Sequence, residues 1–95
     1  MSVKTRAVNI RLEKYDVYIG RPSKWGNPFK IGSTYQGRVL TRQGAVEAFE
    51  DWFENSDRGR VLQRSLPELK GKKLGCFCKP KPCHGDILAR KAEEL

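Results

Sequence analysis

The ten residues from Gly20 to Phe29 constrain the fold of this chain more than any other segment. They include two prolines and two glycines, and Asn27 stands directly before Pro28, which disfavours helical backbone. Neither a helix nor a central strand passes through such a stretch, so we expect a long, structured loop. Alternating apolar residues precede this loop, and apolar residues at helical spacing follow it. The sequence therefore predicts strands, then the loop, then a helix.

The segments before the loop predict two strands. In residues 7–12, Val8, Ile10 and Leu12 alternate with polar neighbours. Residues 15–19 repeat this alternation with side chains that favour strands. We therefore expect both segments in one sheet.

The segment after the loop predicts the main helix. From Thr41 onward, apolar residues recur every three or four positions and acidic residues occupy the opposite face. Thr41 has a hydroxyl suited to cap the first turn. Because Phe49, Trp52 and Phe53 lie on the apolar face, we expect them in the core rather than in contact with a ligand.

Shorter elements are predicted in the C-terminal half. A second helical stretch over 58–65 and a single turn over 66–71 come first. A strand over 73–78 follows, and its period of two places Cys76 and Cys78 on one face. A terminal helix ends the chain.

These elements predict an α/β fold. We expect one small Rossmann-like domain over residues 1–95, with a short mixed or parallel sheet packed by two or three helices. The chain is too short for a second hydrophobic core. If segments 15–19 and 73–78 are neighbouring parallel strands, the loops that follow them leave the sheet at the same edge, where α/β proteins bind ligands.

Charge and composition indicate the class of partner and the compartment. The net charge is +8, with an excess of basic residues in 1–40 and 70–95 and of acidic residues in 41–69. A basic balance favours nucleic acid or nucleotides as partners. The sequence has neither the roughly 20 consecutive apolar residues of a membrane span nor the apolar run of a signal peptide, so we expect no membrane association and a cytoplasmic location.

The three cysteines and the single histidine, Cys76, Cys78, Cys83 and His84, fall within nine residues and have three interpretations. They are candidate ligands of a zinc ion, as a Cys3His set. Alternatively, Cys83 and His84 open the terminal helix, where they and Asp86 are candidate catalytic groups for a reactive thiol, or bind an anion without chemistry. In the third interpretation, Cys76 and Cys78 are small core residues on a strand and His84 is a polar cap.

The loop also carries candidate ligand-binding residues. Arg21 offers a bidentate fork to phosphate, Trp25 a face for stacking on a base, and Asn27 paired donors and acceptors. Ser23 and Lys24 add a hydroxyl and a second cation. The alternative is that Trp25 anchors the loop in the core while the cations are merely solvated.

Long motifs resemble a known family. Tyr-Ile-Gly-Arg-Pro-Ser-Lys-Trp-Gly-Asn-Pro-Phe over 18–29, residues 66–78 and Pro-Cys-His-Gly-Asp over 82–86 are similar to a family of small proteins of unknown function in bacteriophages and bacteria. This resemblance covers nearly the whole chain and implies no established activity. Residues 74–88 also resemble an uncharacterised Rossmann-like family in which a strand ending in Cys precedes a Cys-His pair that opens a helix. That likeness implies a site at the carboxyl end of the strand.

Two classes of function fit these observations best. The first is binding or processing of a nucleotide or nucleic acid in one pocket, formed by the loop from Arg21 to Asn27 and the corner of Cys78, Cys83 and His84. The second is a non-enzymatic nucleic-acid-binding module, with or without a zinc staple. A small effector that docks on a host protein is a further alternative. Whether the protein is an enzyme stays open at this point.

Overall fold

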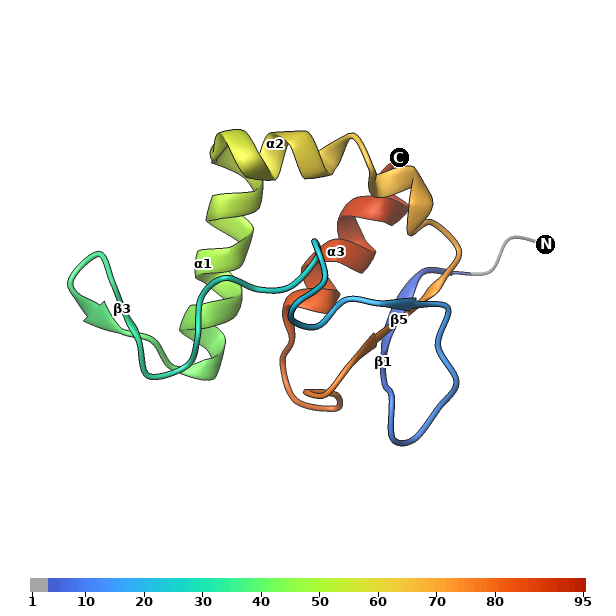
Figure 1. The fold of residues 1–95 in the computed structure, drawn as a ribbon, viewed down its shortest axis with the longest axis horizontal. Coiled ribbons are helices and arrows are strands. Elements are labelled where there is room, and N and C mark those ends of the chain that lie inside the picture. Colours follow the sequence, from blue (N-terminus) through green and yellow to red (C-terminus); the bar gives the residue numbers. More distant parts are fainter. Residues whose placement is uncertain (1–3) are drawn as a thin grey trace.

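The computed structural model describes residues 4–95, and it has the predicted α/β architecture (Figure 1). Three short strands form a parallel sheet in the order β1-β5-β2, so the strand that comes last in the sequence lies in the middle. The strand before the loop pairs parallel with the strand that ends at Cys76, so the condition for a shared sheet edge is met. The strands are β1 (Arg6–Asn9), β2 (Val17–Tyr18) and β5 (Lys73–Cys76).

Helices follow the sequence pattern closely. Thr41 caps the first long helix as predicted, since its hydroxyl oxygen accepts a 3.0 Å hydrogen bond from the Gly44 N–H. Ser56 caps the next helix in the same way, through the Gly59 N–H. No helix within residues 4–95 is long and apolar enough to cross a membrane. The helices are α1 (Arg42–Asn55), α2 (Asp57–Gln63), the 3-10 helix η1 (Leu66–Glu68) and α3 (His84–Glu93).

A hairpin between the loop and α1 was not predicted. Strands β3 (Thr34–Tyr35) and β4 (Arg38–Val39) pair antiparallel and extend from the main body beside α1 (Figure 1). Its turn residues Gln36 and Gly37 both have positive φ, the backbone of a tight two-residue hairpin turn. Tyr35 anchors the hairpin, because its hydroxyl donates a hydrogen bond to Asp51 of α1.

The hydrophobic core lies between the sheet, α1 and α3. Phe49 and Phe53 are fully buried and stack with ring centroids 5.7 Å apart, as their place on the apolar stripe predicted. Trp52 is only partly buried and packs against the edge of this cluster, so its assignment to the core is only partly right. Trp25 of the loop also belongs to the core. Burial of the two phenylalanines fixes the position of α1 relative to the sheet.

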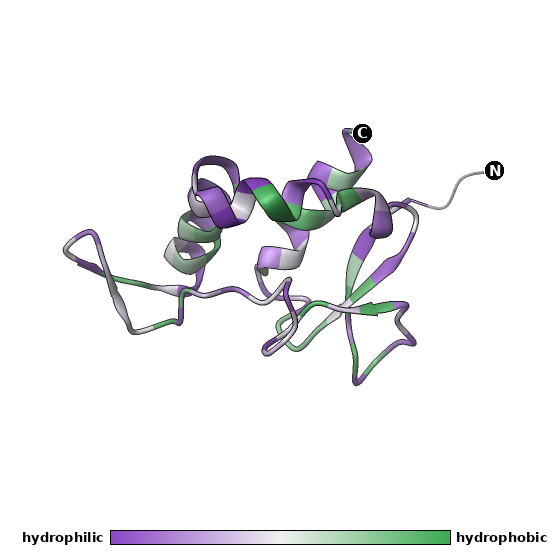
Figure 2. Cartoon of the chain, turned by 45° about the horizontal axis from the view of Figure 1, so that its top comes forward, coloured by the Kyte–Doolittle hydropathy of each residue, from purple (hydrophilic) through white to green (hydrophobic). Residues whose placement is uncertain are grey.

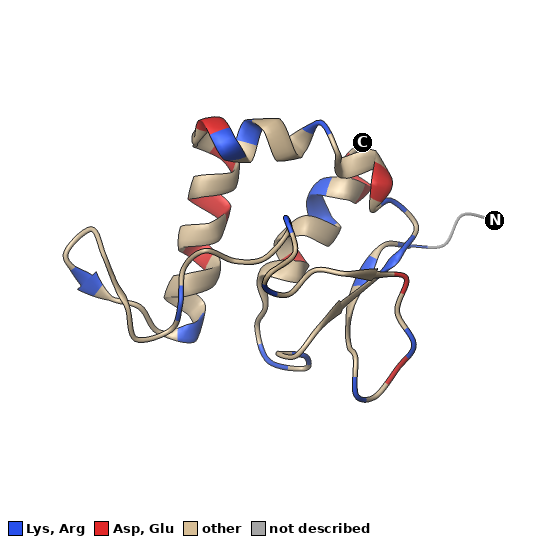
Figure 3. Ribbon diagram, in the orientation of Figure 1, with Lys and Arg blue, Asp and Glu red and all other residues tan. Residues whose placement is uncertain are grey.

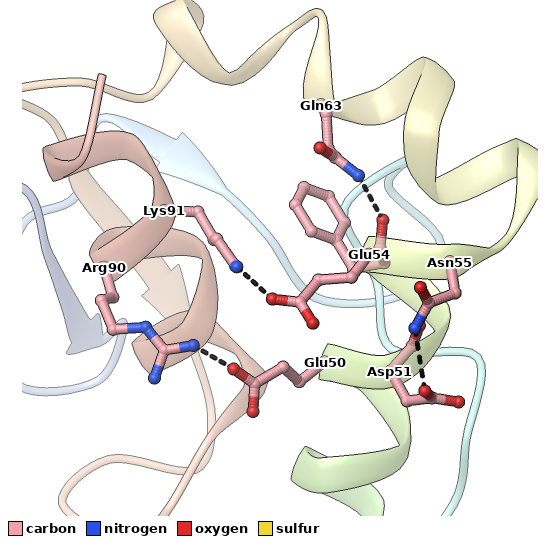
Figure 4. Close-up of polar contacts among 8 residues, drawn as sticks. Glu50, Asp51, Glu54, Asn55, Gln63, Arg90 and Lys91 are labelled. Carbon is pink, nitrogen blue, oxygen red and sulfur yellow. Dashed lines mark hydrogen bonds and ion pairs between the residues drawn. The ribbon is translucent and has the colours of Figure 1, made fainter.

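Ion pairs join the acidic face of α1 to α3. Arg90 pairs with Glu50, and Lys91 pairs with Glu54 (Figure 4). The Gln63 amide of α2 donates a 2.7 Å hydrogen bond to a backbone carbonyl near the end of α1. The acidic middle of the sequence therefore meets basic side chains of the C-terminal helix, and exposed pairs of this kind contribute little stability.

All three predicted strands are shorter than expected, and β2 covers only two residues of the predicted 15–19. After β1 the chain turns at Asn9, whose carbonyl accepts hydrogen bonds from the N–H groups of Leu12 and Glu13, and Leu12 is 74% exposed. After β5 the chain turns again, so Cys78 lies outside the strand and does not share a strand face with Cys76. The Asn9 side chain joins the two turns through a 2.7 Å hydrogen bond to the Lys79 carbonyl.

Candidate functional site

A cavity of about 300 Å³ lies at the carboxyl ends of β2 and β5. Its walls come from the start and end of the loop after β2, the first turn of α1, the segment after β5 and the start of α3. Because the two strands are parallel, the segments that follow them leave the same edge of the sheet. The structure thus brings the loop and the Cys-His corner, about 50 residues apart in sequence, to one cavity, where ligands of α/β proteins commonly bind.

The cationic side chains in the described cavity wall are two arginines. Arg21 comes from the loop and Arg42 from the first turn of α1. Of the residues that the structure describes, no carboxylate lines the cavity, and neither arginine takes part in an ion pair. The wall is therefore suited to an anionic ligand.

The sequence analysis did not identify Arg42 as a site residue. The indication was present: a helix N-terminus favours acidic side chains, and the first turn of α1 has none although the rest of that helix is acidic. Figure 3 shows this contrast, with acidic residues along α1 and a basic residue at its first turn. A cation held at the positive end of a helix dipole is mildly unfavourable for stability, which points to a role outside folding.

His84 is held as a neutral imidazole. It is 7% exposed, and burial lowers the pKa of its ring. Nε2 lies 2.9 Å from the Ile19 carbonyl oxygen, which can only accept, so Nε2 carries the proton. Nδ1 is then an acceptor, and it lies 3.6 Å from the Cys83 sulfur. The His84 ring therefore adds no positive charge to the cavity wall.

Two thiols interact in the cavity wall. The pKa of Cys76 is lowered to about 6, chiefly because the Cys83 thiol donates a hydrogen bond to its sulfur, and backbone N–H groups of Cys78 and Lys79 add to this effect. The pKa of Cys83 is raised, because its proton is held by Cys76 and its side chain is buried. The sequence pointed to Cys83 as the reactive thiol, whereas the structure favours the thiolate at Cys76.

The predicted zinc ligands do not converge. Within residues 4–95, no group of three or more cysteine, histidine or acidic side chains is placed to hold a metal ion. His84 directs Nε2 at the Ile19 carbonyl, and the Cys83 sulfur accepts a 3.3 Å hydrogen bond from the Gly85 N–H at the start of α3. Cys76 and Cys83 are free thiols, and Cys78 lies beyond the strand. The Cys3His zinc site, one of the three interpretations of this cluster, is therefore not assembled within residues 4–95.

Trp25 and Lys24 lie away from the cavity. Trp25 is 3% exposed and packed in the core, so it offers no free face for stacking, and the alternative of a core anchor is the correct one. Lys24 pairs with Glu68 at 3.1 Å and lies over the Trp25 ring. Both residues hold the loop against the rest of the protein.

Asn27 lines the cavity and also fixes its shape. Its side-chain amide donates a 3.1 Å hydrogen bond to the Ala45 carbonyl of α1, and its oxygen accepts one from the Phe29 N–H. Asn27 therefore holds the loop to the same helix turn that carries Arg42. Ser23, also predicted to bind ligand, does not line the cavity, and its buried hydroxyl has no hydrogen-bond partner within residues 4–95.

Asp86 lies outside the cavity. One carboxylate oxygen accepts a hydrogen bond from the Cys83 N–H, which completes a capping box at the start of α3. The other pairs with Lys79 at 2.8 Å. This side chain lines a separate hollow on the side of Thr5 and Arg90. The structure thus holds the Asp86 carboxylate against the Cys83 backbone but outside the cavity that Cys83 and His84 line.

The cavity is also lined by aromatic rings that the sequence analysis did not identify as site residues. Tyr18 ends β2, Phe29 ends the loop, and Phe77 follows β5 directly. Their nearness to the site followed from the predicted strand ends, since residues just after parallel strands meet at one edge. The directions of their side chains could not be predicted, because the alternation of side chains between the two faces ends where the strand ends.

Comparison with known proteins places the chain in a family. Residues 3–94 match the family described as "Domain of unknown function (DUF4326)". The chain belongs to this family. The family resemblance drawn from the three motifs is therefore confirmed at the level of a small viral and phage-type domain of unknown function.

Two relatives are viral proteins. An uncharacterised 12.4 kDa protein from the nrdA-td intergenic region of Enterobacteria phage T4 is 39% identical, over 95% of this chain and 79% of its own length. Uncharacterised protein R718 of Acanthamoeba polyphaga mimivirus is 32% identical over 77% of this chain. The match spans 57% of the mimivirus protein, so that protein has a further part without a counterpart here. No solved structure matches the chain.

Proposed function

We propose that the cavity binds a nucleotide, with the phosphate at Arg21 and Arg42 and the base among the aromatic side chains of the wall. The observation that carries this proposal is the meeting of two unpaired guanidinium groups with aromatic rings in a cavity whose described wall has no carboxylate. Guanidinium forks match phosphate oxygens, and aromatic faces stack on bases.

The position and size of the cavity support the proposal. Its volume of about 300 Å³ is in the range of small-molecule sites. The first turn of α1, at Arg42, and the first turn of α3, at His84, both border it. Helix N-termini favour anions, so the two helices add to the preference for phosphate.

The proposal extends to processing of the ligand. A thiolate at Cys76 is a nucleophile in the cavity wall: its sulfur forms a bond to the ligand while the ligand's bond to its leaving group breaks, and the leaving group takes up the proton of the neighbouring Cys83 thiol. This replaces Cys83 by Cys76 as the attacking group. Incubation with nucleotides, followed by mass spectrometry of the protein and chromatography of the ligand, tests this step, with Cys76→Ser as the inactive control.

Binding is tested by calorimetry with the common ribonucleoside and deoxyribonucleoside 5′-monophosphates and with the matching nucleosides. We expect at least one monophosphate to bind, its nucleoside to bind at least tenfold more weakly, and Arg21→Gln and Arg42→Gln each to weaken monophosphate binding. Arg38→Gln, on the exposed hairpin outside this cavity, is the matched control and is expected to leave affinity unchanged. Equal affinity for nucleoside and monophosphate, or no binding at millimolar concentration, contradicts the proposal.

A further inference from the structure

The two faces of the parallel sheet are covered differently. The strand register places Ala7, Val17 and Leu74 on one face. This face packs against α3, because a Cβ on Gly85 of α3 would lie only 3.0 Å from the Ala7 Cβ. Figures 1 and 2 show the helices of the described chain on this side of the sheet.

Aromatic side chains occupy the opposite face. The register there aligns Val8, Gly75 and Tyr18. Gly75 leaves room for a neighbour, since a Cβ at that position would come within 2.7 Å of the Tyr15 ring and of Ile10. Parallel sheets are usually covered by helices on both faces, whereas here a tyrosine that is 45% exposed lies across the middle strand.

Three aromatic rings and one arginine are neighbours on this side, with the ring planes of Tyr15 and Tyr18 at 55° and those of Tyr18 and Phe77 at 79°. We call this group the aromatic platform: Tyr15, Tyr18, Phe77 and Arg11. The ring centroids of Tyr15 and Tyr18 lie 6.4 Å apart, and those of Tyr18 and Phe77 lie 6.2 Å apart. Phe77 is 54% exposed, and the Arg11 guanidinium lies 5.6 Å from its ring centroid.

The aromatic platform continues into the cavity. Tyr18 and Phe77 line the cavity wall, while Tyr15 and Arg11 lie outside it. The charge beside the platform is positive: within residues 4–95, Arg11 has no ion-pair partner, and the nearby Glu13 is paired with Arg6. Exposed rings and an unpaired cation next to an anion-binding cavity suit a ligand that alternates flat bases with phosphates.

We propose, building on the proposed function, that the cavity takes one nucleotide of a single-stranded nucleic acid and that the adjoining base stacks on the aromatic platform. A duplex keeps its base faces stacked inside, so a strand that uses both sites is single-stranded or has an extruded nucleotide. Each base stacked on an aromatic ring strengthens binding by roughly tenfold. Arg11 contacts the phosphate that links the two nucleotides.

The test compares each nucleoside 5′-monophosphate with the corresponding homotrinucleotide, in ribose and deoxyribose form, by calorimetry. We expect the best trinucleotide to bind at least tenfold more tightly than its monophosphate. Tyr15→Leu fills the space over Gly75 but removes the flat ring, and Arg11→Gln removes the charge. Both are expected to abolish most of this gain while monophosphate affinity stays the same, since neither side chain lines the cavity. Arg58→Gln is the matched charge control.

A fluorescent trinucleotide reports the stacking directly. With 2-aminopurine next to the nucleotide in the cavity, binding is expected to quench its fluorescence, and Tyr15→Leu to reduce the quenching. A monophosphate that binds as tightly as every trinucleotide overturns this inference and leaves the proposed function standing. The same holds for a trinucleotide gain that survives both variants, or for a duplex that binds as tightly as the single strand. Absence of binding by every monophosphate and trinucleotide overturns both proposals.

Discussion

The two ends of α1 use charge in opposite ways. Towards its C-terminus, Glu50 and Glu54 pair with Arg90 and Lys91 of α3, over a layer of buried aromatic side chains (Figure 4). At its N-terminus, Arg42 borders the cavity without any ion-pair partner within residues 4–95. Charged side chains that form ion pairs within the chain have a structural role. A charge left without an ion-pair partner, at the helix end where it is least favourable, is available to a ligand.

The largest effect on stability is expected at the C-terminal end of α1, which packs against the core. Phe53→Ala removes a fully buried ring and is expected to lower the free energy of unfolding by about 3–5 kcal/mol. Urea denaturation followed by circular dichroism measures this change. A variant as stable as the original protein would show that the packing of α1 against the core does not hold this end in place.

An intermediate effect is expected at the N-terminal end of α1, which borders the cavity. This effect is on ligand binding rather than on stability. Arg42→Gln is expected to weaken binding of the best nucleoside monophosphate about tenfold or more, because a charge-assisted contact is lost. The free energy of unfolding should stay constant or rise by a few tenths of a kcal/mol, since a cation leaves the positive end of the helix dipole. Loss of stability without loss of affinity would reverse the assignment of roles to the two ends.

The thiol pair in the cavity predicts a pH dependence. Absorbance at 240 nm should show one thiolate forming with a pKa of about 6, and Cys83→Ala should move this titration upward by removing the hydrogen bond to Cys76. The Cys76 pKa is lowered by folding, so its contribution to stability is present above the unfolded thiol pKa of roughly 8.5 and is lost as pH falls through about 6.

Titration of Cys83 changes the stability with pH in the opposite direction. Its pKa is raised by folding, so above roughly pH 8.5 the folded state holds a proton that the unfolded state releases, and stability falls again. Stability from this pair should therefore rise from about pH 6 to a maximum near roughly pH 8.5 and fall above it. A curve without such a maximum, measured by urea denaturation across pH 5–10 with Cys83→Ala as the control, would show that the two thiols titrate independently.

The smallest effect is expected from the ion pairs. Glu50→Gln is expected to cost less than about 1 kcal/mol, because the pair with Arg90 is largely exposed to solvent. Nucleotide affinity should not change. Comparison of urea midpoints at low and high salt measures this contribution, and the difference between variants should shrink as salt rises. An affinity loss equal to that of Arg42→Gln would abolish the distinction between the two ends.

Much of the fold could be predicted because local patterns determined it. The apolar spacing after Thr41 gave the helix and its buried face, and the proline and glycine content of 20–29 gave the loop. The hairpin was missed because each strand has only two residues, too few for alternation to be visible, and because Gln36 is an unusual residue at positive φ.

The position of the candidate site was predictable, but the side chains that line it were not. Parallel pairing brought the loop and the cysteines to one sheet edge, which requires only topology. Which side chains face the cavity depends on packing between distant segments. Trp25 was free for stacking in the sequence but is enclosed by the core, and Arg42 lies on a helix that supplied no sign of its position relative to the loop.

The order of strands in the sheet has a consequence for how this protein is made. β1 and β2 have β5 as their shared neighbour, and β5 ends only at Cys76. During synthesis from the N-terminus, the first two strands therefore have no hydrogen-bonding partner in the sheet until most of the chain has been made. Neither the sheet nor the cavity exists in a nascent chain that stops before residue 73. Ribosome-bound chains of increasing length should show protease resistance appearing late and in a single step, as expected where long-range pairing controls folding.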